Sequence, residues 1–153
     1  MSLKGVVNAA ENCLLHRRRG RSLYTVAFFS YYAEVFMFEL GRNKILRGKN
    51  EFNKVHSKGH SLANREMVLY ILEDENLNGK VGFAAGKKLG CAVIRNRVKR
   101  ILREAYRLNQ HNIKKNCAII LVGRKNLVAA KCDVAIKSLK DICKRAKIWI
   151  DKD

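Results

Sequence analysis

The sequence predicts an α+β fold: a small two-layer sandwich of one central, mostly antiparallel sheet of about four strands with three helices, in the order αβββαβα. Three observations predict it. The chain of 153 residues is long enough for one domain with a core and short for two. Segments with helical spacing of apolar residues alternate with short apolar runs. The composition also changes near residue 40, and the periodic pattern begins only after it.

The first helix is predicted at residues 49–58, because Phe52 and Val55 lie three apart on one face and Gly59 follows the last turn. Residues 66–73 predict a strand whose alternating side chains are apolar on both faces. One face would carry Met67, Leu69 and Ile71, and the other Val68, Tyr70 and Leu72. Such a strand is either buried on both sides or has one apolar face available to a ligand.

The remaining elements follow in order. Residues 74–79 are typical of a hairpin turn that leads into a strand at 80–86. Residues 91–108 predict a long helix, 117–122 a buried strand and 129–148 a final helix. The core-facing stripe of the final helix consists of residues spaced by three and four: Cys132, Ile136, Leu139, Cys143, Ala146 and Ile150.

Residues 1–40 form an N-terminal extension, with a basic run at 16–21 and an apolar, aromatic stretch at 23–40. That order is also found in membrane anchors and signal-like segments. We expect no membrane contact, because Glu34 lies within the apolar stretch and a lone carboxylate in hydrocarbon costs about 3 kcal/mol. The extension is then peripheral to function, or translation begins at Met37, or the segment forms an accessory helix or strand.

The net charge indicates the class of partner. The chain has 32 Lys and Arg residues against 13 Asp and Glu, a formal charge of +19. A domain with so much like charge is typically one that binds a polyanion, most often nucleic acid. Since 48% of the residues are hydrophobic, the charge belongs to a folded body rather than to a disordered tail.

Cysteines and histidines give no sign of a cofactor. The five cysteines contain no Cys-x-x-Cys pair, and the four histidines have no metal-ligand spacing, so we expect neither disulfides nor bound metal. The cysteines are interpreted as small buried thiols in a reducing cytoplasm. They are Cys13, Cys91, Cys117, Cys132 and Cys143.

The predicted helix at 91–108 is strongly basic. Its apolar stripe is Ile94, Val98, Ile101, Ala105 and Leu108. Nearly all other long side chains are cationic, and Glu104 is the one acid among them. Arg95, Lys99 and Arg103 form a series of like charges four apart, which destabilises a helix unless an external anion relieves it. The alternative interpretation is an ordinary solvated helix face.

The basic segment resembles the RNR signature of the bacterial ribonuclease P protein family. The matching pattern is Lys87-Lys88-x-Gly90-x-Ala92-Val93-x-Arg95-Asn96-Arg97-x-Lys99-Arg100-x-x-Arg103. The likeness extends upstream through residues 49–52, 58–59 and 63–65 to 68–70, and downstream through the last strand and helix. It covers residues 43–150, which we take as the ribonuclease P protein domain, and leaves the N-terminal extension unexplained.

The resemblance implies a function and two binding surfaces. A protein of this family is a subunit of an endoribonuclease that removes the 5′ leader during tRNA maturation, and the chemistry is carried by the RNA and its Mg²⁺ rather than by protein side chains. The residues expected to bind the catalytic RNA are Lys87, Lys88, Arg95, Asn96, Arg97, Lys99, Arg100 and Arg103. The residues expected to line a cleft for the leader of precursor tRNA are Phe52, Val68 and Tyr70. The family fold also implies a left-handed crossover through the basic helix.

Some residues depart from the family pattern, and other readings stay open. His56 stands where a second aromatic is common, Cys91 replaces an asparagine, and residues 84–86 replace a serine-bearing stretch. Phe52 and Tyr70 could simply be core residues. An enzyme using its own acids would have only the cluster at 73–75, which is expected in a turn. A ribosomal or other structural RNA-binding protein is the second rival. No obligate protein partner is evident.

Overall fold

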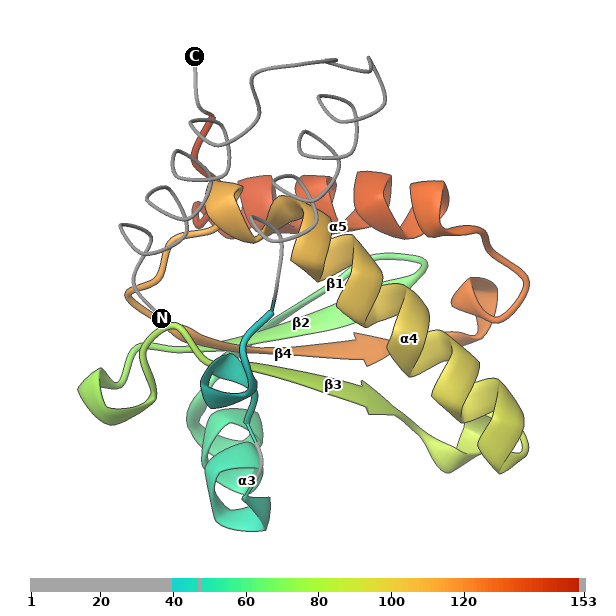
Figure 1. The fold of residues 1–153 in the computed structure, drawn as a ribbon, viewed down its shortest axis with the longest axis horizontal. Coiled ribbons are helices and arrows are strands. Elements are labelled where there is room, and N and C mark those ends of the chain that lie inside the picture. Colours follow the sequence, from blue (N-terminus) through green and yellow to red (C-terminus); the bar gives the residue numbers. More distant parts are fainter. Residues whose placement is uncertain (1–39, 47, 152–153) are drawn as a thin grey trace, which may run out of the picture. The chain divides into compact units, whose positions relative to one another are not determined.

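The computed structural model describes residues 40–46 and 48–151 (Figure 1). The expectations for residues 1–39 lie outside this part of the chain. The main elements are α3 (Lys49–Lys58), β1 (His60–Ala63), β2 (Met67–Leu72), β3 (Val81–Ala85), α4 (Ala92–Asn109), β4 (Ala118–Gly123) and α5 (Cys132–Arg145). Their order is αβββαβα, which confirms the predicted α+β fold.

The four strands form one mixed sheet in the order β1-β2-β4-β3. β1 with β2 and β2 with β4 are antiparallel, whereas β3 and β4 are parallel, so the sheet is mostly antiparallel as predicted. A parallel pair requires a crossover, and α4 supplies it. The left hand expected for this crossover stays a prediction.

The hairpin predicted at residues 74–79 is wrong, because β4 lies between β2 and β3. Residues Glu75–Leu77 instead form a 3-10 helix, which begins with the Asp74 carboxylate accepting a hydrogen bond from the Asn76 backbone N–H. Its Leu77 is buried. The segment therefore carries the chain to the far side of β4 rather than reversing it beside β2.

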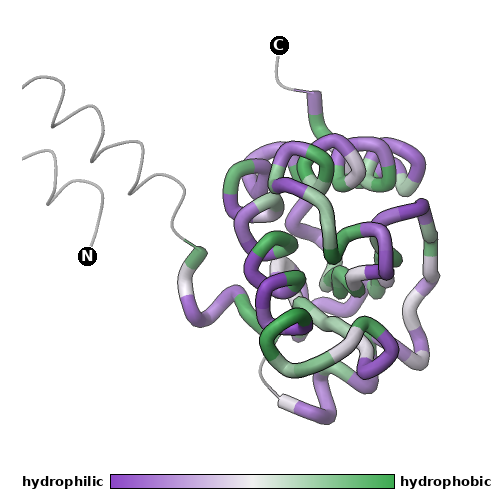
Figure 2. Tube along the Cα trace, turned by 90° about the vertical axis from the view of Figure 1, so that its right-hand side faces the viewer, coloured by the Kyte–Doolittle hydropathy of each residue, from purple (hydrophilic) through white to green (hydrophobic). Residues whose placement is uncertain are grey.

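The two faces of the sheet are covered unequally. α4 and α5 pack on one face and α3 lies on the other side of the sheet, below it in Figure 1. The larger core, on the α4 and α5 side, includes Met67, Leu69, Val98, Leu102, Leu139 and Ile142. The smaller one contains Leu46, Val55, Leu77, Ala118 and Ile120. Figure 2 shows hydrophobic and hydrophilic residues alternating along the helices, as amphipathic packing requires.

Both helical stripes differ in part from the prediction. α4 buries Val98, Leu102, Ala105 and Tyr106, and Leu108 is 37% exposed. α5 is shorter at both ends than the predicted 129–148, and buries Ala135, Ser138, Leu139, Ile142 and Cys143. The predicted apolar stripe does not continue along the helix to Ile150, because the chain turns at Lys147, where φ is 56°. Trp149 then pairs with Ile113, and the Ile150 N–H bonds the Asn112 carbonyl at 2.7 Å.

The cysteine prediction holds for part of the set. Cys117 and Cys143 are buried, Cys132 is partly buried, and all four described cysteines are free thiols. Cys91 is exposed, because it stands at the solvated start of α4, so the prediction of a buried thiol is wrong there. Cys13 lies outside the described residues. None of the helices within 40–46 and 48–151 is long and apolar enough to cross a membrane.

Candidate nucleic-acid interface

The first candidate surface is the sheet face on the α3 side. α3 covers one part of it, where Val55 is fully buried. Phe52 lies over β3 at Gly82, and a Cβ at this glycine would come within 3.0 Å of the Phe52 ring. A larger residue at position 82 would therefore push the ring away from the sheet. Two ion pairs fix α3 to the segment before β3: Lys54 with Asp74, and Lys80 with Glu51 at 2.7 Å.

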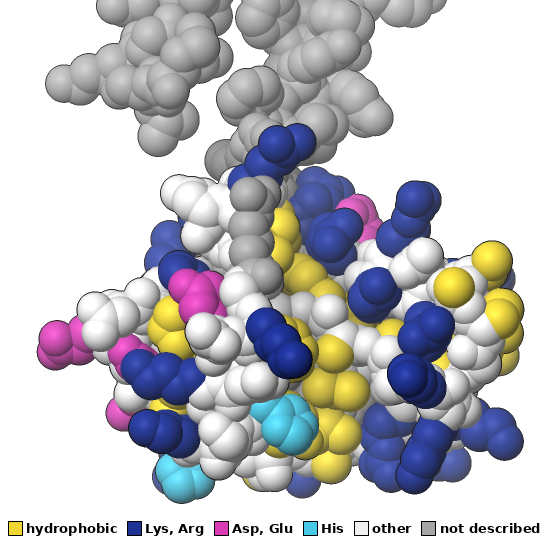
Figure 3. All heavy atoms as spheres, turned by 90° about the horizontal axis from the view of Figure 1, so that it is seen from below, with side chains coloured by type: hydrophobic (Ala, Val, Ile, Leu, Met, Phe, Trp, Pro, Cys, Tyr) yellow, Lys and Arg dark blue, Asp and Glu magenta, His cyan; other side chains and the backbone are white. Residues whose placement is uncertain are grey.

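The other part of this face is more open. Val68 of β2 lies opposite Val122 of β4, which in turn lies opposite Ala84 of β3. All three side chains are only partly buried. Figure 3, seen from below Figure 1, shows a band of hydrophobic side chains on this side of the molecule with lysine and arginine side chains beside it. The three residues predicted to line a cleft, Phe52, Val68 and Tyr70, belong to α3 and β2 on this side of the sheet, and their role in binding a leader stays a prediction.

Tyr70 and His56 form a ring pair at the edge of α3. Their ring centroids are 4.6 Å apart and the planes are inclined by 32°. His56 is exposed, and Phe52 and Tyr70 are partly buried. Phe52 and Tyr70 also pack against the smaller core. The alternative that these rings are core residues is therefore correct for one side of each ring. The accessible side of each ring remains available for stacking, and the histidine keeps a ring at the position where a second aromatic was expected.

The second candidate surface begins before α4. Lys87 and Lys88 are exposed in a 3-10 helix, and Gly90, with φ 124°, turns the chain into α4. This conformation strongly favours glycine. Hydrogen bonds from the backbone N–H groups of Ile94 and Val93 lower the pKa of the Cys91 thiol. The N–H groups at the start of α4 thus favour negative charge beside the two lysines.

Along α4, one cation is paired with acid and the others are not. Arg107 forms a bidentate pair with Glu104, at 2.6 and 2.9 Å, and this pairing lowers the pKa of the Glu104 carboxyl. Within the described residues, no ion pair involves any of the cations predicted to bind the catalytic RNA: Lys87, Lys88, Arg95, Arg97, Lys99, Arg100 and Arg103. Asn96, Arg97 and Arg100 are exposed. The predicted surface is thus strongly cationic, and no acid of the described part of the chain neutralises it through an ion pair.

The predicted cations do not all occupy one narrow face. Arg103 lies over the Phe83 ring of β3, 5.6 Å from its centroid, so it leans toward the edge strand. Helical spacing puts Lys99 on the same flank, since it is four residues from Arg103. Arg95 is partly buried, and its Nε has no hydrogen-bond partner among the described residues. The exposed Arg97 and Arg100 are therefore the strongest candidates for direct phosphate contact.

Sequence reasoning missed a further group of cations at one end of the sheet. β2 begins where β3 and β4 end, because Met67 is paired with Gly123 and Gly123 with Ala85. The loops at that end bring together exposed basic residues from three parts of the chain: Arg65, Lys87, Lys88, Arg124 and Lys125. Arg65, Arg124 and Lys125 could not be grouped from the sequence, because the position of β4 in the sheet was unknown.

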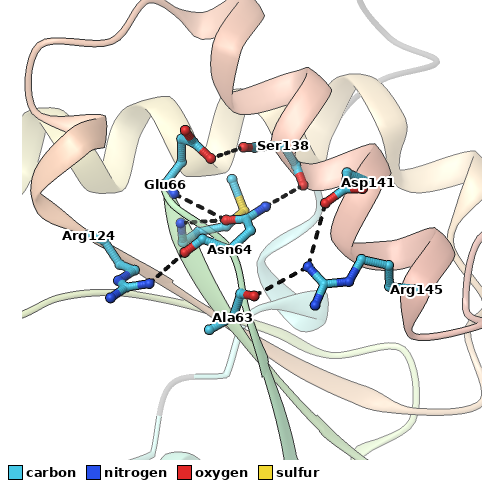
Figure 4. Close-up of polar contacts among 8 residues, drawn as sticks. Ala63, Asn64, Glu66, Arg124, Ser138, Asp141 and Arg145 are labelled. Atoms are coloured by element: carbon cyan, nitrogen blue, oxygen red, sulfur yellow. Dashed lines mark hydrogen bonds and ion pairs between the residues drawn. The ribbon is translucent and has the colours of Figure 1, made fainter.

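Hydrogen bonds hold the β1–β2 turn at this end (Figure 4). The Asn64 side chain accepts from the backbone N–H groups of Glu66 and Met67, at 3.2 and 2.9 Å, and donates to the Ser138 carbonyl of α5 at 3.0 Å. The Ser138 hydroxyl donates to Glu66 at 2.6 Å, and Arg124 donates to the Asn64 carbonyl at 2.7 Å. The turn beside Val68 is thereby attached to α5 and to the residue that follows β4.

The described residues contain few groups suited to catalysis or metal binding. Asp74, from the acidic cluster at 73–75, is engaged by Lys54, whose hydrogen bond lowers the pKa of that carboxyl. Residues 40–46 and 48–151 contain no group of three or more His, Cys, Asp or Glu placed to hold a metal ion.

The chain is similar to known proteins over most of the described residues. The family model "Ribonuclease P" matches residues 40–147. The ribonuclease P protein component of an Exiguobacterium species is 41% identical over 104 residues, 68% of this chain and 90% of that protein. The component from Clostridioides difficile is 38% identical, over 73% of this chain and 99% of its own length.

Solved structures are similar as well. The RNase P protein of Staphylococcus aureus has a TM-score of 0.62 and 30% identity, covering 69% of this chain and 97% of that one. The RNase P protein of Thermotoga maritima has a TM-score of 0.57 and 29% identity, covering 65% of this chain and 94% of that one.

Proposed function

Because the chain belongs to the bacterial ribonuclease P protein family, we propose that its two surfaces hold two different RNAs, the α4 surface the catalytic RNA and the cleft the leader of precursor tRNA. Membership makes the chain a protein subunit of ribonuclease P, the endoribonuclease that processes tRNA 5′ leaders, with the ribonuclease P RNA as its partner. The assignment of each surface to one RNA is the proposal.

The observation that carries the proposal is the presence of two unlike surfaces in one domain, an apolar one on the α3 side of the sheet and a cationic one along α4. The cleft has partly exposed rings at Phe52 and Tyr70, and single-stranded RNA binds such rings by stacking, with little sequence preference. The α4 surface has unneutralised guanidinium groups, which grip phosphate oxygens in a bidentate manner. The cations at the end of the sheet, near the starts of β2 and α4, would continue the phosphate track.

The proposed mechanism gives the protein a positioning role. The leader is held in the cleft while α4 is fixed on the catalytic RNA, so the cleavage site is brought to the RNA in a defined orientation. Mg²⁺, which takes oxygen ligands such as phosphates, is assigned to the RNA and would supply the activated water. The side chains of Arg97 and Arg100 neutralise phosphate charge, and this allows the two RNAs to approach each other.

We also propose that residues 43–150 are the functional domain and that residues 1–40 are peripheral to it. The match of the family model to residues 40–147 supports this division. The proposed place of action is the cytoplasm, where bacterial tRNA precursors are made.

Reconstitution tests the proposed function. Cleavage of precursor tRNA by a bacterial ribonuclease P RNA would be measured at low Mg²⁺ with and without the full chain. We expect the protein to raise the cleavage rate, because phosphate repulsion limits the RNA alone under these conditions. An unchanged rate, with protein shown to be folded by circular dichroism, would overturn the proposal.

A further inference from the structure

A pocket lies at the end of the sheet away from the cationic loops. It has a volume of about 220 Å³ and is lined by Lys44, Asn78, Gly79, Tyr106, Gln110 and Lys115. Gly79 and Lys115 precede β3 and β4, and Gln110 follows α4, so the pocket is at the starts of these strands. Lys44 is held nearby because the Leu46 N–H donates to the Val81 carbonyl at 2.9 Å. The two proposed RNA surfaces include none of these residues.

Gln110 is the unusual residue of this pocket. Only 5% of it is exposed, and its Nε2 has no hydrogen-bond partner among the described residues. Buried amide groups nearly always have a partner, so an unsatisfied one indicates a missing acceptor. Gln110 lines the pocket, and the terminal torsion of a glutamine is broad, so a modest rotation can direct its amide N–H toward a bound acceptor.

The charge of the pocket indicates that the acceptor is an anion. Lys44 and Lys115 are exposed at its rim, and neither forms an ion pair with another described residue. None of the described residues that line the pocket carries a carboxylate. Burial raises the pKa of Tyr106 to about 12, so the phenol stays protonated at neutral pH and its O–H can donate. Gln110, Tyr106 and the two lysines are therefore the donors and cations of the lining, and Asn78 adds an amide group whose nitrogen donates to the Asn116 and Asp74 carbonyls.

We propose that this pocket binds a phosphate group, with Gln110 as the buried donor and Lys44 and Lys115 as the cations. A phosphate offers several acceptor oxygens in different directions, which suits donors that come from separate elements. The volume of about 220 Å³ corresponds to about seven water molecules, enough for a phosphate and part of its hydration. The phosphate belongs to the RNA backbone in the assembled enzyme, a step that rests on the proposed function, or it is free phosphate.

Gln110 provides a site-specific reporter because it is the only glutamine in the sequence. The full chain labelled with ¹⁵N at the glutamine side chain gives one pair of amide resonances, which would be followed while inorganic phosphate is added at constant ionic strength. We expect a saturable shift of this pair. Chloride at the same ionic strength is expected to leave it unchanged.

Lysine variants separate the pocket from general charge effects. Lys44→Ala with Lys115→Ala should weaken phosphate binding about tenfold, because the attraction of two exposed lysines for the phosphate is lost. Lys131→Ala with Lys137→Ala removes the same charge from exposed positions on and before α5 and should leave the binding unchanged. The absence of a saturable shift would show a site filled by water only, and equal weakening in both variants would show nonspecific attraction. Either result would overturn the proposal.

The same variants distinguish the two sources of phosphate. If the phosphate is part of the catalytic RNA, the pocket variant should lose about ten times more affinity for that RNA than the α5 control. Equal affinities, together with the saturable shift of Gln110, would overturn the RNA source and leave free phosphate as the ligand. Cleavage stimulation by the unaltered chain is measured separately, so failure of the proposed function remains distinguishable from failure of this site.

Discussion

The two faces of β2 differ in burial although both are apolar. Met67 and Leu69 on the α4 and α5 side are fully buried, whereas Val68 and Tyr70 on the α3 side are only partly buried. The same strand therefore supplies core packing on one face and an accessible apolar surface on the other. The comparison teaches that a strand without a polar face need not be buried on both sides. Substitutions on the two faces should accordingly affect different properties.

The largest expected effect is on the buried face. Leu69→Ala should lower the free energy of unfolding by about 2 to 5 kcal/mol, because it leaves a cavity among fully buried side chains. Val68→Ala, one residue away on the open face, should cost about 1 kcal/mol. Urea denaturation measures both. Similar losses in the two variants would show that the faces are equally packed.

The open face should instead affect leader binding. Tyr70→Ala removes an accessible ring, and a stacked base contributes about 1 to 3 kcal/mol, so affinity of the holoenzyme for precursor tRNA should fall about 5-fold to 150-fold. Affinity for mature tRNA, which has no leader, should change little. The ratio of the two affinities is the measurement, since partial unfolding would reduce both together. Equal losses of affinity for precursor and mature tRNA would contradict the proposal that the leader binds in the cleft.

A smaller effect is expected from substitutions on α4, and it is measured as the salt dependence of binding to the catalytic RNA. Arg97→Ala with Arg100→Ala should weaken binding to the catalytic RNA and reduce the slope of log affinity against log salt by about 1 to 2, because two phosphate contacts are lost. Arg107→Ala is the matched control, since this arginine is paired with Glu104. If the control changed the slope as much as the double variant, the unpaired cations would have no special role.

The smallest effect concerns the attachment of α3. The hydrogen bond from Lys54 lowers the pKa of Asp74, so this pair stabilises the fold above the ordinary carboxyl value of 3.8 and is lost as the pH falls through the lower, folded value. Asp74→Asn keeps an acceptor for the Asn76 N–H but removes the charge. The stability difference between the two proteins should be greatest near neutral pH and disappear in acid. A difference independent of pH from 7 to about 3 would exclude the charge as its cause.

Local patterns in the sequence predicted the helices and strands that depend mainly on residues close together in the chain. α3 was predicted at its observed bounds, and β2, α4 and β4 within one residue at each end. α3 ends before Gly59 as predicted, but the glycine is needed there for a different reason from the turn conformation on which the prediction was based. Gly59 has φ −77°, and glycine is required there because a Cβ would clash with the Val55 carbonyl oxygen.

The pairing of strands that lie far apart in the chain could not be predicted from the sequence. β1 was not located, because its His60–Ala63 segment is short and mostly exposed. β4 lies between β2 and β3, so the segment predicted as a hairpin turn instead connects two strands that are not neighbours. The same position of β4 places Arg124 beside Arg65 at one end of the sheet. The phosphate pocket was equally hidden, since Lys44, Gln110 and Lys115 meet only in the folded chain.

The division between the two surfaces can be tested most directly by photo-crosslinking in the reconstituted holoenzyme. Precursor tRNA with a photoreactive uridine in the leader would be irradiated and the attached peptide identified by mass spectrometry. The account predicts attachment to residues 49–58 or 67–72, the α3 and β2 walls of the cleft. Attachment of the leader to the outer face of α4 or to α5, with none in the cleft, would contradict it.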